Sequence, residues 1–477
     1  MNYSMIKYTL GWLLIFEAGF FLVPLITAAV FWESAFFSFL IAMAISAALG
    51  ALLTYKKPSD TTLYAKEGFV IVALSWIVMS IFGALPFMFT GVTASFVDAL
   101  FETVSGFTTT GASIFTEVEC LPKSVIMWRS FTHWVGGMGV LVFIMAFLPL
   151  SGGQNMHIMR AESPGPEVSK LVPRVKNTAV ILYIIYFVIT AIMFTVLLIS
   201  GMSVFEALNT SFSTAGTGGF GFRNDSFASA TATQQIIVTV FMLLFSINFN
   251  SYYLILKLKP RNAFNSEVRA FILVVIAATA IVTMNVASTF DNIFEALRHA
   301  AFTVASLIST TGFTTANFDL WPALSQTVLL LIMFIGACAG STGGGIKVSR
   351  IIILFKGMAR ELRTLIHPRQ VKKITIDSRP VEHEVVRSVN AYIVTFIVVF
   401  AVSLMAISFD NKDLVTNFSA VTATLNNVGP GLNEAYANYA SFSPFSKIVL
   451  SFDMLIGRLE LFPMLILFSP ATWKRNG

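Results

Sequence analysis

Long apolar segments dominate the chain and alternate with shorter, half-apolar stretches. A membrane-spanning helix needs about 20 consecutive, mostly apolar residues, and ten segments have that length and composition. The pattern therefore predicts an all-α integral membrane protein with ten transmembrane helices. The predicted spans are residues 8–30, 34–54, 68–90, 125–149, 177–200, 233–256, 268–288, 326–355, 388–409 and 446–470.

After the first two spans, one arrangement of apolar and polar residues occurs four times. A span is followed by a half-apolar stretch that ends in Thr, Ser, Asn and Gly, and then by a second span. Because repetition of this kind indicates repeated structural units, we expect four pseudo-symmetric helix–pore loop–helix repeats around one central pore. The expected boundaries are 1–64 for an N-terminal helix pair, then 65–150, 151–257, 258–356 (with a broken second helix) and 357–477 for the repeats.

The half-apolar stretches align at a glycine and are long enough for a half-helix that re-enters the membrane. Their terminal glycines are Gly111, Gly219, Gly312 and Gly429. Thirteen residues earlier, the stretches are expected to begin at Asp98, Glu206, His299 and Thr416. In the second copy Gly216 is an alternative to Gly219, although Gly219 keeps the common offset and is followed by Phe, as Gly312 is.

The residue types at these glycines suit a cation. Non-helical backbone at membrane depth is tolerated only where protein buries it or where it lines a water-filled path, so four such segments indicate a shared cavity. Glycine permits positive φ, which lets successive carbonyls point the same way, and a half-helix directs its partial negative C-terminus at the ion. The alternative is a helix-packing surface, but four copies in register favour a filter. The expected filter residues are Thr109, Thr110, Gly111, Thr217, Gly218, Gly219, Thr310, Thr311, Gly312, Asn427, Val428 and Gly429.

Acidic residues gather at the expected outer starts of the half-helices. They are Asp98, Glu206, Asp291, Glu295 and Asp413. Carboxylates near a helix N-terminus favour the helix dipole, and this capping role is the preferred interpretation. Concentration of cations at the mouth of the pore is the alternative.

A second unusual stretch lies inside the eighth predicted span, where the sequence reads "GACAGSTGGGIK" from Gly336 to Lys347. Three consecutive glycines cost about 1 kcal/mol each in a helix relative to alanine, so we expect the helix to unwind into a loop that obstructs the path as a gate. Tight helix packing is the alternative. Arg458, deep in the last span, is a functional candidate because intramembrane charges are rare. The expected gating residues are Gly340, Ser341, Thr342, Gly343, Gly344, Gly345, Lys347 and Arg458. For Arg129 and His133, snorkelling or helix contacts suffice as an explanation.

Composition and charge agree with a membrane protein. The chain is 56% hydrophobic and 12% charged, against about 25% charged residues in soluble domains. The net charge of +6 does not indicate binding to nucleic acid. Most of the 31 Lys and Arg residues fall in the terminal segments and in every second loop, which the predicted spans place on one side of the membrane. The positive-inside rule then places both termini in the cytoplasm. The basic loop 356–388 is a topology anchor, a docking surface, or both.

The sequence offers little for other kinds of chemistry. Two cysteines far apart, Cys120 and Cys338, exclude a disulfide scaffold and a Cys-based metal site. The five histidines are scattered, and no nucleophile–base constellation or nucleotide loop stands out. We therefore expect neither an enzyme nor an organic cofactor.

The motifs resemble those of the Trk/Ktr/HKT potassium transporters, and are most similar to the bacterial TrkH type. The residues that carry this resemblance are "SGFTTTGAS", "AGTGGFG", "STTGFTT", "NNVGPGLNE", "GACAGSTGGGIK" and "IGRLELFP". The resemblance implies a pseudo-fourfold pore with filter glycines at Gly111, Gly219, Gly312 and Gly429, an intramembrane gating loop at 337–346 and a basic residue, Arg458, beneath the filter. It also implies a homodimer in the bacterial inner membrane, with a cytosolic nucleotide-binding regulator of the TrkA type.

The functional expectation is potassium uptake by diffusion through the filter, gated by the glycine loop, with K⁺ as the transported ion. The alternative is a secondary carrier, such as a symporter, that couples potassium to Na⁺ or H⁺. Such carriers tend to have inverted repeats and broken helices at a midplane site. Here the repeats share one orientation, and no carboxylate for proton coupling stands out in the expected cavity.

Overall fold

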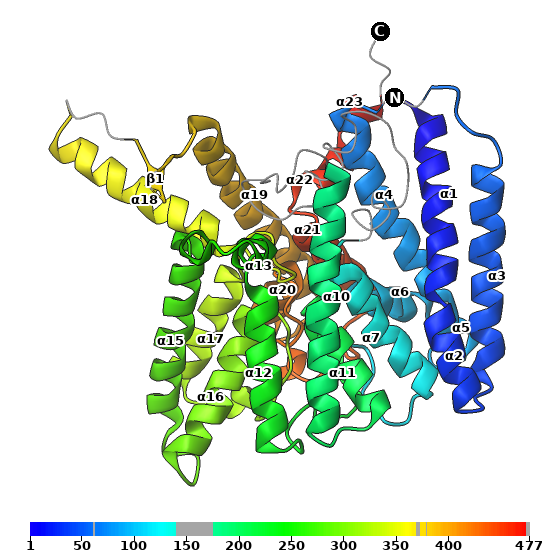
Figure 1. Ribbon diagram of the computed structural model, residues 1–477, viewed down its shortest axis with the longest axis horizontal. Helices are drawn as coiled ribbons and strands as arrows, with labels where there is room; N and C mark the ends of the chain where they lie inside the picture. Colours follow the sequence, from blue (N-terminus) through cyan, green and yellow to red (C-terminus); the bar gives the residue numbers. More distant parts are fainter. Residues whose placement is uncertain (61–62, 140–174, 369–372, 378, 474–477) are drawn as a thin grey trace.

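The computed structural model describes residues 1–60, 63–139, 175–368, 373–377 and 379–473. Helices dominate this part of the chain, and most of the long ones run side by side between two ends of the molecule (Figure 1). The fold is thus all-α, as predicted. A two-stranded hairpin, β1 (Thr375–Ile376) and β2 (Arg379–Pro380), pairs antiparallel near the end where the termini lie.

The helices follow the predicted order. The N-terminal pair comprises α1 (Tyr3–Phe20), α2 (Leu22–Val30) and α3 (Ala35–Thr54), and the next unit α4 (Ala65–Gly83), α5 (Leu85–Phe89), α6 (Phe96–Phe107) and α7 (Lys123–Gly137). The second unit holds α10 (Val175–Ile199), α11 (Val204–Gly216), α12 (Ala232–Ser246), α13 (Phe249–Leu256) and α14 (Pro260–Ala263). The third holds α15 (Ser266–Val286), α16 (Ile293–Ile308), η1 (Phe318–Leu320), α17 (Ala323–Ile335) and α18 (Val348–Ile366). The last holds α19 (His383–Ile407), η2 (Ser408–Asp410), α20 (Leu414–Leu425), η3 (Asn433–Ala435), α21 (Pro444–Arg458), α22 (Phe462–Leu465), η4 (Ile466–Phe468) and α23 (Pro470–Trp473).

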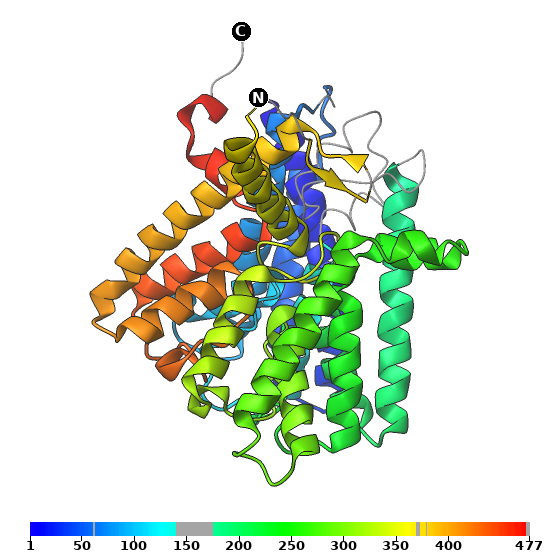
Figure 2. The ribbon, with the colours of Figure 1, turned by 90° about the vertical axis from the view of Figure 1, so that its left-hand side faces the viewer.

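The part of the chain that the structure describes contains fewer continuous spans than the ten predicted. Within the described residues, six helical segments are long and apolar enough to cross a membrane. They are Tyr3–Val30, Ala35–Thr54, Lys66–Phe89, Val180–Ile199, Ser266–Val286 and His383–Asp410. The predicted span 233–256 is instead a pair, α12 and α13, bent by 90° (Figure 2). Counting this pair as one span gives seven.

The other predicted spans are interrupted. Helix α7 ends at Gly137, and the rest of the predicted span 125–149 lies outside the described residues beyond residue 139. Residues 336–347 separate α17 from α18. Helix α21 ends at Arg458, where Glu460 and Leu461 turn to positive φ of 58° and 67°, so the prediction of one helix over 446–470 is wrong. The length of an apolar segment does not reveal these breaks, because a turn in the backbone hardly changes the number of apolar residues in the segment.

Close helix packing joins the N-terminal pair. A Cβ added to Gly50 of α3 would lie 2.8 Å from the carbonyl oxygen of Gly11 in α1, so only glycine allows this approach. Buried apolar side chains of the pair share one cluster with the first and last units. A second cluster lies mainly in the third unit, and another joins the second unit to part of the third. Many large apolar side chains on α3, α10, α15 and α19 face outward, as expected for a surface in contact with lipid.

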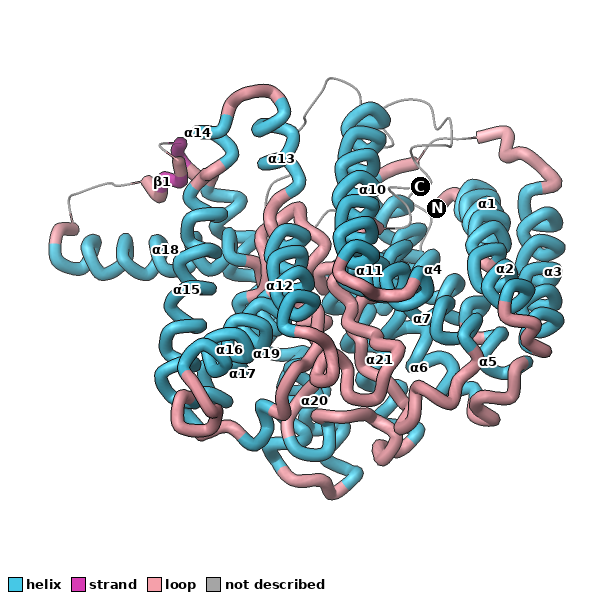
Figure 3. Tube along the Cα trace, turned by 60° about the horizontal axis from the view of Figure 1, so that its bottom comes forward, coloured by secondary structure: helices cyan, strands magenta, loops and turns pink. Residues whose placement is uncertain are grey.

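Both ends of the described chain lie on the same side of the molecule (Figure 1). The Tyr3 hydroxyl donates to the carbonyl oxygen of Trp473 at 3.1 Å, and the Lys66 ammonium donates to that of Ala471 at 3.3 Å. Four short helices, α6, α11, α16 and α20, end inside the molecule, where loops gather between the longer helices (Figure 3).

Candidate functional site

Four interior segments repeat one backbone conformation. Just after α6, α11, α16 and α20, a residue with left-handed backbone is followed two positions later by a glycine with positive φ. The left-handed residues are Thr109 (φ 56°), Thr217 (56°), Thr310 (61°) and Asn427 (55°), and the glycines are Gly111 (81°), Gly219 (81°), Gly312 (85°) and Gly429 (100°). Because β-branched residues rarely adopt positive φ, the three threonines indicate a conformation that the surroundings enforce.

The same hydrogen bond closes each of these helices. An amide donates to the carbonyl five residues earlier: Thr110 to Ser105 at 2.9 Å, Gly218 to Ser213 at 2.9 Å, Thr311 to Ser306 at 2.8 Å, and Val428 to Ala423 at 2.8 Å. This bond, with a left-handed residue before its donor, defines the Schellman ending of a helix. Four helices therefore end alike, and each leads directly into a glycine-containing segment without regular secondary structure.

The four glycine-containing segments form a closed ring. A Cβ placed on each glycine would collide with the carbonyl oxygen of the residue before the next glycine. The distance from the added Cβ to the carbonyl oxygen is 1.9 Å for Gly111 and Gly218, 1.9 Å for Gly219 and Thr311, 2.3 Å for Gly312 and Val428, and 2.6 Å for Gly429 and Thr110. The order of contacts runs through all four segments and returns to the first, so the backbones of neighbouring segments pack against one another around a closed ring.

The second segment owes its irregular sequence to a neighbouring histidine. A Cβ on Gly218 would lie 2.3 Å from the His133 ring, so the position that Thr110 and Thr311 occupy elsewhere must be glycine here. The backbone also distinguishes the two candidate glycines. Gly216 is the last residue of α11, whereas Gly219 has the positive φ of Gly111 and Gly312.

Side-chain caps begin the four short helices. Ser95, Ser203 and Asn292 each accept a hydrogen bond from an amide three residues on, and these amides belong to Asp98, Glu206 and Glu295. The prediction of His299 as the third start is therefore wrong. Helix α16 begins at Ile293, six residues before His299, because Asn292 provides the cap.

The acidic residues near these caps have local partners. Asp98 pairs with Lys447 at 2.6 Å, and Glu206 with Arg223 at 3.0 Å. Asp413 caps α20, and its hydrogen bonds from Thr416 hold the pKa of this carboxyl below its ordinary value, so it is ionised at neutral pH. The capping interpretation agrees with Glu206, which completes a capping box with Ser203, and with Asp413, which is itself the cap of α20.

The glycine loop lies against two of the ring segments. The Gly344 amide donates to the Thr310 hydroxyl at 2.6 Å, and the Gly345 amide donates to the Asn426 carbonyl at 3.1 Å. A Cβ on Gly344 would lie 2.4 Å from that same carbonyl oxygen. The predicted break in the eighth span is thus present, and its glycines permit direct contact with the ring.

Side chains of the loop form hydrogen bonds within it and to the end of α12. The Ser341 hydroxyl donates to Cys338 at 2.6 Å, the Thr342 hydroxyl donates to Phe245 at 3.1 Å, and the Lys347 ammonium donates to the Gly343 carbonyl. Gly340, with φ of 71°, accepts from the Phe249 amide at 3.0 Å across the bend between α12 and α13. All the expected gating residues of the loop therefore lie in one connected segment.

Arg458 joins the loop to a distant helix end. Its guanidinium donates to the Thr342 carbonyl at 2.8 Å, and to the carbonyls of Gly136 at 2.5 Å and Gly137 at 2.6 Å. The last two belong to the C-terminus of α7, where the partial negative charge of the helix end favours a cation. The neighbouring acids have other contacts, because Glu460 pairs with Arg350 and Asp453 accepts from Ser403.

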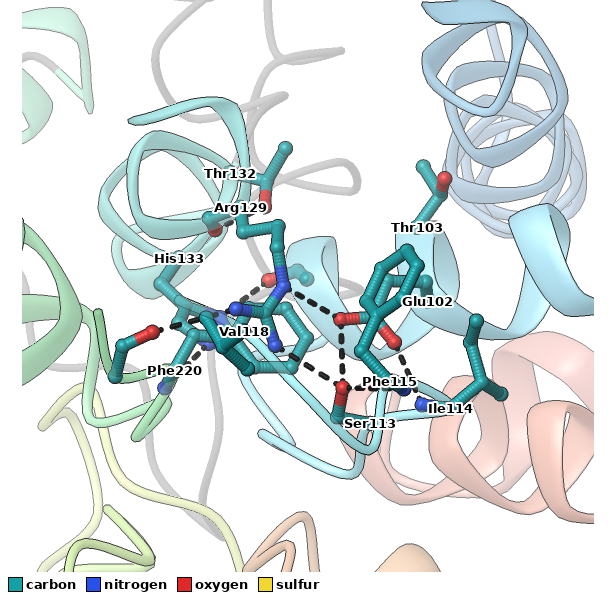
Figure 4. A network of polar contacts seen from close by, with 12 residues as sticks. Glu102, Thr103, Ser113, Ile114, Phe115, Val118, Arg129, Thr132, His133 and Phe220 are labelled. Carbon is teal, nitrogen blue, oxygen red and sulfur yellow. Dashed lines mark hydrogen bonds and ion pairs between the residues drawn. The ribbon is translucent and has the colours of Figure 1, made fainter. Parts of the chain in front are cut away.

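Sequence reasoning missed a buried polar network behind the first two ring segments (Figure 4). Arg129 and Glu102 form an ion pair of 2.7 Å, with side chains 2% and 0% exposed. His133, also fully buried, accepts from the Phe220 amide at 3.2 Å and bonds the Gly106 carbonyl at 2.7 Å. Snorkelling of Arg129 and His133 is therefore excluded. The rarity of ionisable residues inside apolar segments was the signal that could have identified this network.

The structure is that of a multi-pass helical membrane protein in which four short helices end in glycine-containing segments that contact one another in a ring. Comparison with known proteins agrees. Residues 35–475 match the family model TrkH, described as cation transport protein. The chain is 36% identical over 482 residues to "Trk system potassium uptake protein TrkH" of Salmonella typhimurium, covering 99% of this chain and all of that protein. It is 35% identical to the protein of the same name from Escherichia coli K12, again with 99% and 100% coverage.

A solved structure is also similar. The crystal structure of the potassium transporter TrkH from Vibrio parahaemolyticus superposes with a TM-score of 0.90 at 32% sequence identity, covering 99% of this chain and all of that one. The chain belongs to the TrkH family of cation transport proteins. It is accordingly a transporter rather than an enzyme.

Proposed function

We propose that this protein takes up potassium through a selectivity filter made by the four ring segments. The single observation that carries the proposal is the closed ring of glycine contacts, since rings of backbone carbonyls replace the hydration shell of K⁺ in potassium filters. The oxygens come from Thr109, Thr110, Gly111 and their counterparts in the other three segments. Similarity to potassium uptake proteins over the whole chain supports the choice of ion.

The four segments would belong to four pseudo-symmetric repeats, which are the units proposed at 65–150, 151–257, 258–356 and 357–477. The common Schellman endings support this division. The ten-helix description would then count broken helices as spans, with the breaks after α7, α12, α17 and α21 as part of the pore architecture.

Conduction would be controlled by the glycine loop. Its contacts with Thr310 and Asn426 support a position against the inner side of the filter. Arg458 would stabilise the closed loop through the Thr342 carbonyl while placing a positive charge beside the path. Opening then requires these hydrogen bonds to break together.

The membrane setting and partners complete the proposal. The protein would lie in the bacterial inner membrane as a homodimer with both termini in the cytoplasm, and a cytosolic nucleotide-binding subunit of the TrkA type would act on the basic side. The charge of loop 356–388 supports an acidic or lipid-facing contact there. The relatives' description as parts of a Trk system supports a further subunit.

Flux measurements on the purified protein in liposomes test this function. Passive K⁺ flux that follows only the K⁺ gradient and the membrane potential is the expected result. Dependence on a Na⁺ or H⁺ gradient would instead favour the coupled carrier. Absence of K⁺ flux, in the presence and absence of a regulatory subunit, would overturn the proposal.

A further inference from the structure

The first ring segment is held in place differently from the second and third. In those two segments a serine near the helix end donates to a carbonyl beyond the glycine: Ser213 to Phe220 at 2.8 Å and Ser306 to Phe313 at 2.6 Å. The equivalent Ser105 hydroxyl is buried without such a bond among the described residues. Another group must therefore fix the outer end of the first segment.

Glu102 takes over this role. Its carboxylate accepts hydrogen bonds from the Ile114 amide at 2.9 Å and the Ser113 hydroxyl at 3.1 Å, both just beyond Gly111. Such bonds to a buried carboxylate are charge-assisted and stronger than neutral ones. At the same offset from the glycine, the other segments have Thr210, Thr303 and Ala420. The carboxylate is thus particular to the first segment.

Arg129 connects this carboxylate to the second segment (Figure 4). While Nε donates to Glu102, another guanidinium nitrogen donates to the Ser113 hydroxyl at 3.0 Å, and a third donates to the Gly221 carbonyl at 3.3 Å. The guanidinium also lies 4.2 Å from the centre of the Phe220 ring. One planar side chain therefore contacts the outer ends of two adjacent segments.

We propose that the Glu102–Arg129 pair is a positioning element that sets the spacing between the first and second filter segments and thereby contributes to discrimination between K⁺ and Na⁺. This inference rests on the proposed filter function. The planar fork of arginine holds several oxygens in a fixed geometry, and the pair carries no net charge toward the ion path. An unpaired arginine there would repel every cation.

The test compares Arg129→Lys and Glu102→Gln with the unmodified protein in liposomes, with K⁺ and Na⁺ fluxes measured per folded molecule. Lysine keeps the charge but cannot reach Glu102, Ser113 and Gly221 together, so the K⁺/Na⁺ flux ratio should fall on the order of tenfold. Glu102→Gln leaves Arg129 unpaired and should reduce the flux of both cations. Combining Glu102→Gln with Arg129→Gln should restore flux but not selectivity.

Arg223→Lys is the matched control, because Arg223 forms the same kind of pair with Glu206 at a partly exposed site, with side chains 39% and 26% exposed. Its flux ratio should not change. Size-exclusion profiles and melting temperatures in detergent identify variants that do not fold. A folded Arg129→Lys protein with an unaltered ratio would overturn the inference while leaving the proposed function intact. Loss of K⁺ flux in the unmodified protein would instead overturn the proposed function.

Discussion

At the scale of single residues, the ring glycines meet two separate demands. Gly111 needs a positive φ of 81°, and it must also leave space for the Gly218 carbonyl oxygen 1.9 Å from where a Cβ would lie. Serine satisfies neither demand, so either the ring widens or the carbonyls turn. Both changes alter the distances from the oxygens to the ion, on which selectivity depends.

Gly111→Ser should therefore lower the K⁺/Na⁺ selectivity, by on the order of tenfold for a change of about 1.4 kcal/mol in relative ion binding. Flux assays with each ion in liposomes measure it. Gly19→Ser is the matched control, because a Cβ at Gly19 would meet nothing within 4 Å. Unchanged selectivity in Gly111→Ser would count against a filter role for this glycine.

A second residue-scale prediction concerns the contact between Gly218 and His133. Gly218→Ala places a methyl group 2.3 Å from the imidazole, and overpacking of this kind costs about 1–3 kcal/mol. His133→Ala removes the obstacle, although it also removes the bonds to Gly106 and Phe220. The double variant should thus be more stable than the sum of the two single effects predicts, as measured by thermal unfolding in detergent. Strict additivity would show that the contact relaxes without cost.

At the scale of elements, the loop between α17 and α18 has two connections that a gate must release. Two amides of the loop donate hydrogen bonds to Thr310 and Asn426 of the ring segments. Arg458 donates a hydrogen bond to the carbonyl of Thr342 in the loop. Since Arg458 also bonds the last carbonyls of α7, a movement of the loop is linked to the ends of two other helices. Several other elements therefore hold the loop, in addition to its own backbone hydrogen bonds.

Arg458→Ala should raise basal K⁺ flux, because three hydrogen bonds from a charged donor are lost, each worth about 1.5–3 kcal/mol. Deleting Gly343–Gly345 should have the same effect by shortening the obstruction. Both variants are measured by tracer flux in reconstituted vesicles without a regulatory subunit. Arg360→Ala, at an exposed ion pair with Glu361, serves as the control. If neither variant raises flux, the loop is not the closed gate.

At the scale of the whole molecule, the two native cysteines offer a test of how the protein is oriented in the membrane. Cys120 is exposed and Cys338 is buried. Cys120 lies in the turn before α7, where the Lys123 amide donates to Glu33 at 2.6 Å, and Glu33 lies at the end of the N-terminal pair remote from Met1. The proposed topology, with both termini in the cytoplasm, therefore predicts that Cys120 faces the outside.

A membrane-impermeant maleimide should label Cys120 in intact cells, and Cys120→Ser should abolish the signal. The hydrogen bond to Glu117 raises the pKa of the Cys120 thiol, so the thiolate fraction and the labelling rate should continue to rise with pH above the ordinary thiol range. Labelling that requires permeabilised cells would reverse the predicted topology.

Much of this molecule could be predicted from local sequence. The apolar lengths indicated an all-α membrane protein, the repeated glycine motifs located Gly111, Gly219, Gly312 and Gly429, and the triple glycine located the helix break. These features are local, because apolar length, glycine conformational freedom and helix propensity act over a few residues. The start of α16 was misplaced because a cap at Asn292 replaced the common offset.

Tertiary structure alone decided which residues meet. Short-range rules are sufficient for the class of fold, for the positions of the ring glycines and for the position of the loop. The order of contacts around the ring, the neighbours of Arg458 and the burial of Glu102 with Arg129 depend on helices far apart in the chain. The reason is physical: a buried charge is tolerated only where the fold supplies its partner.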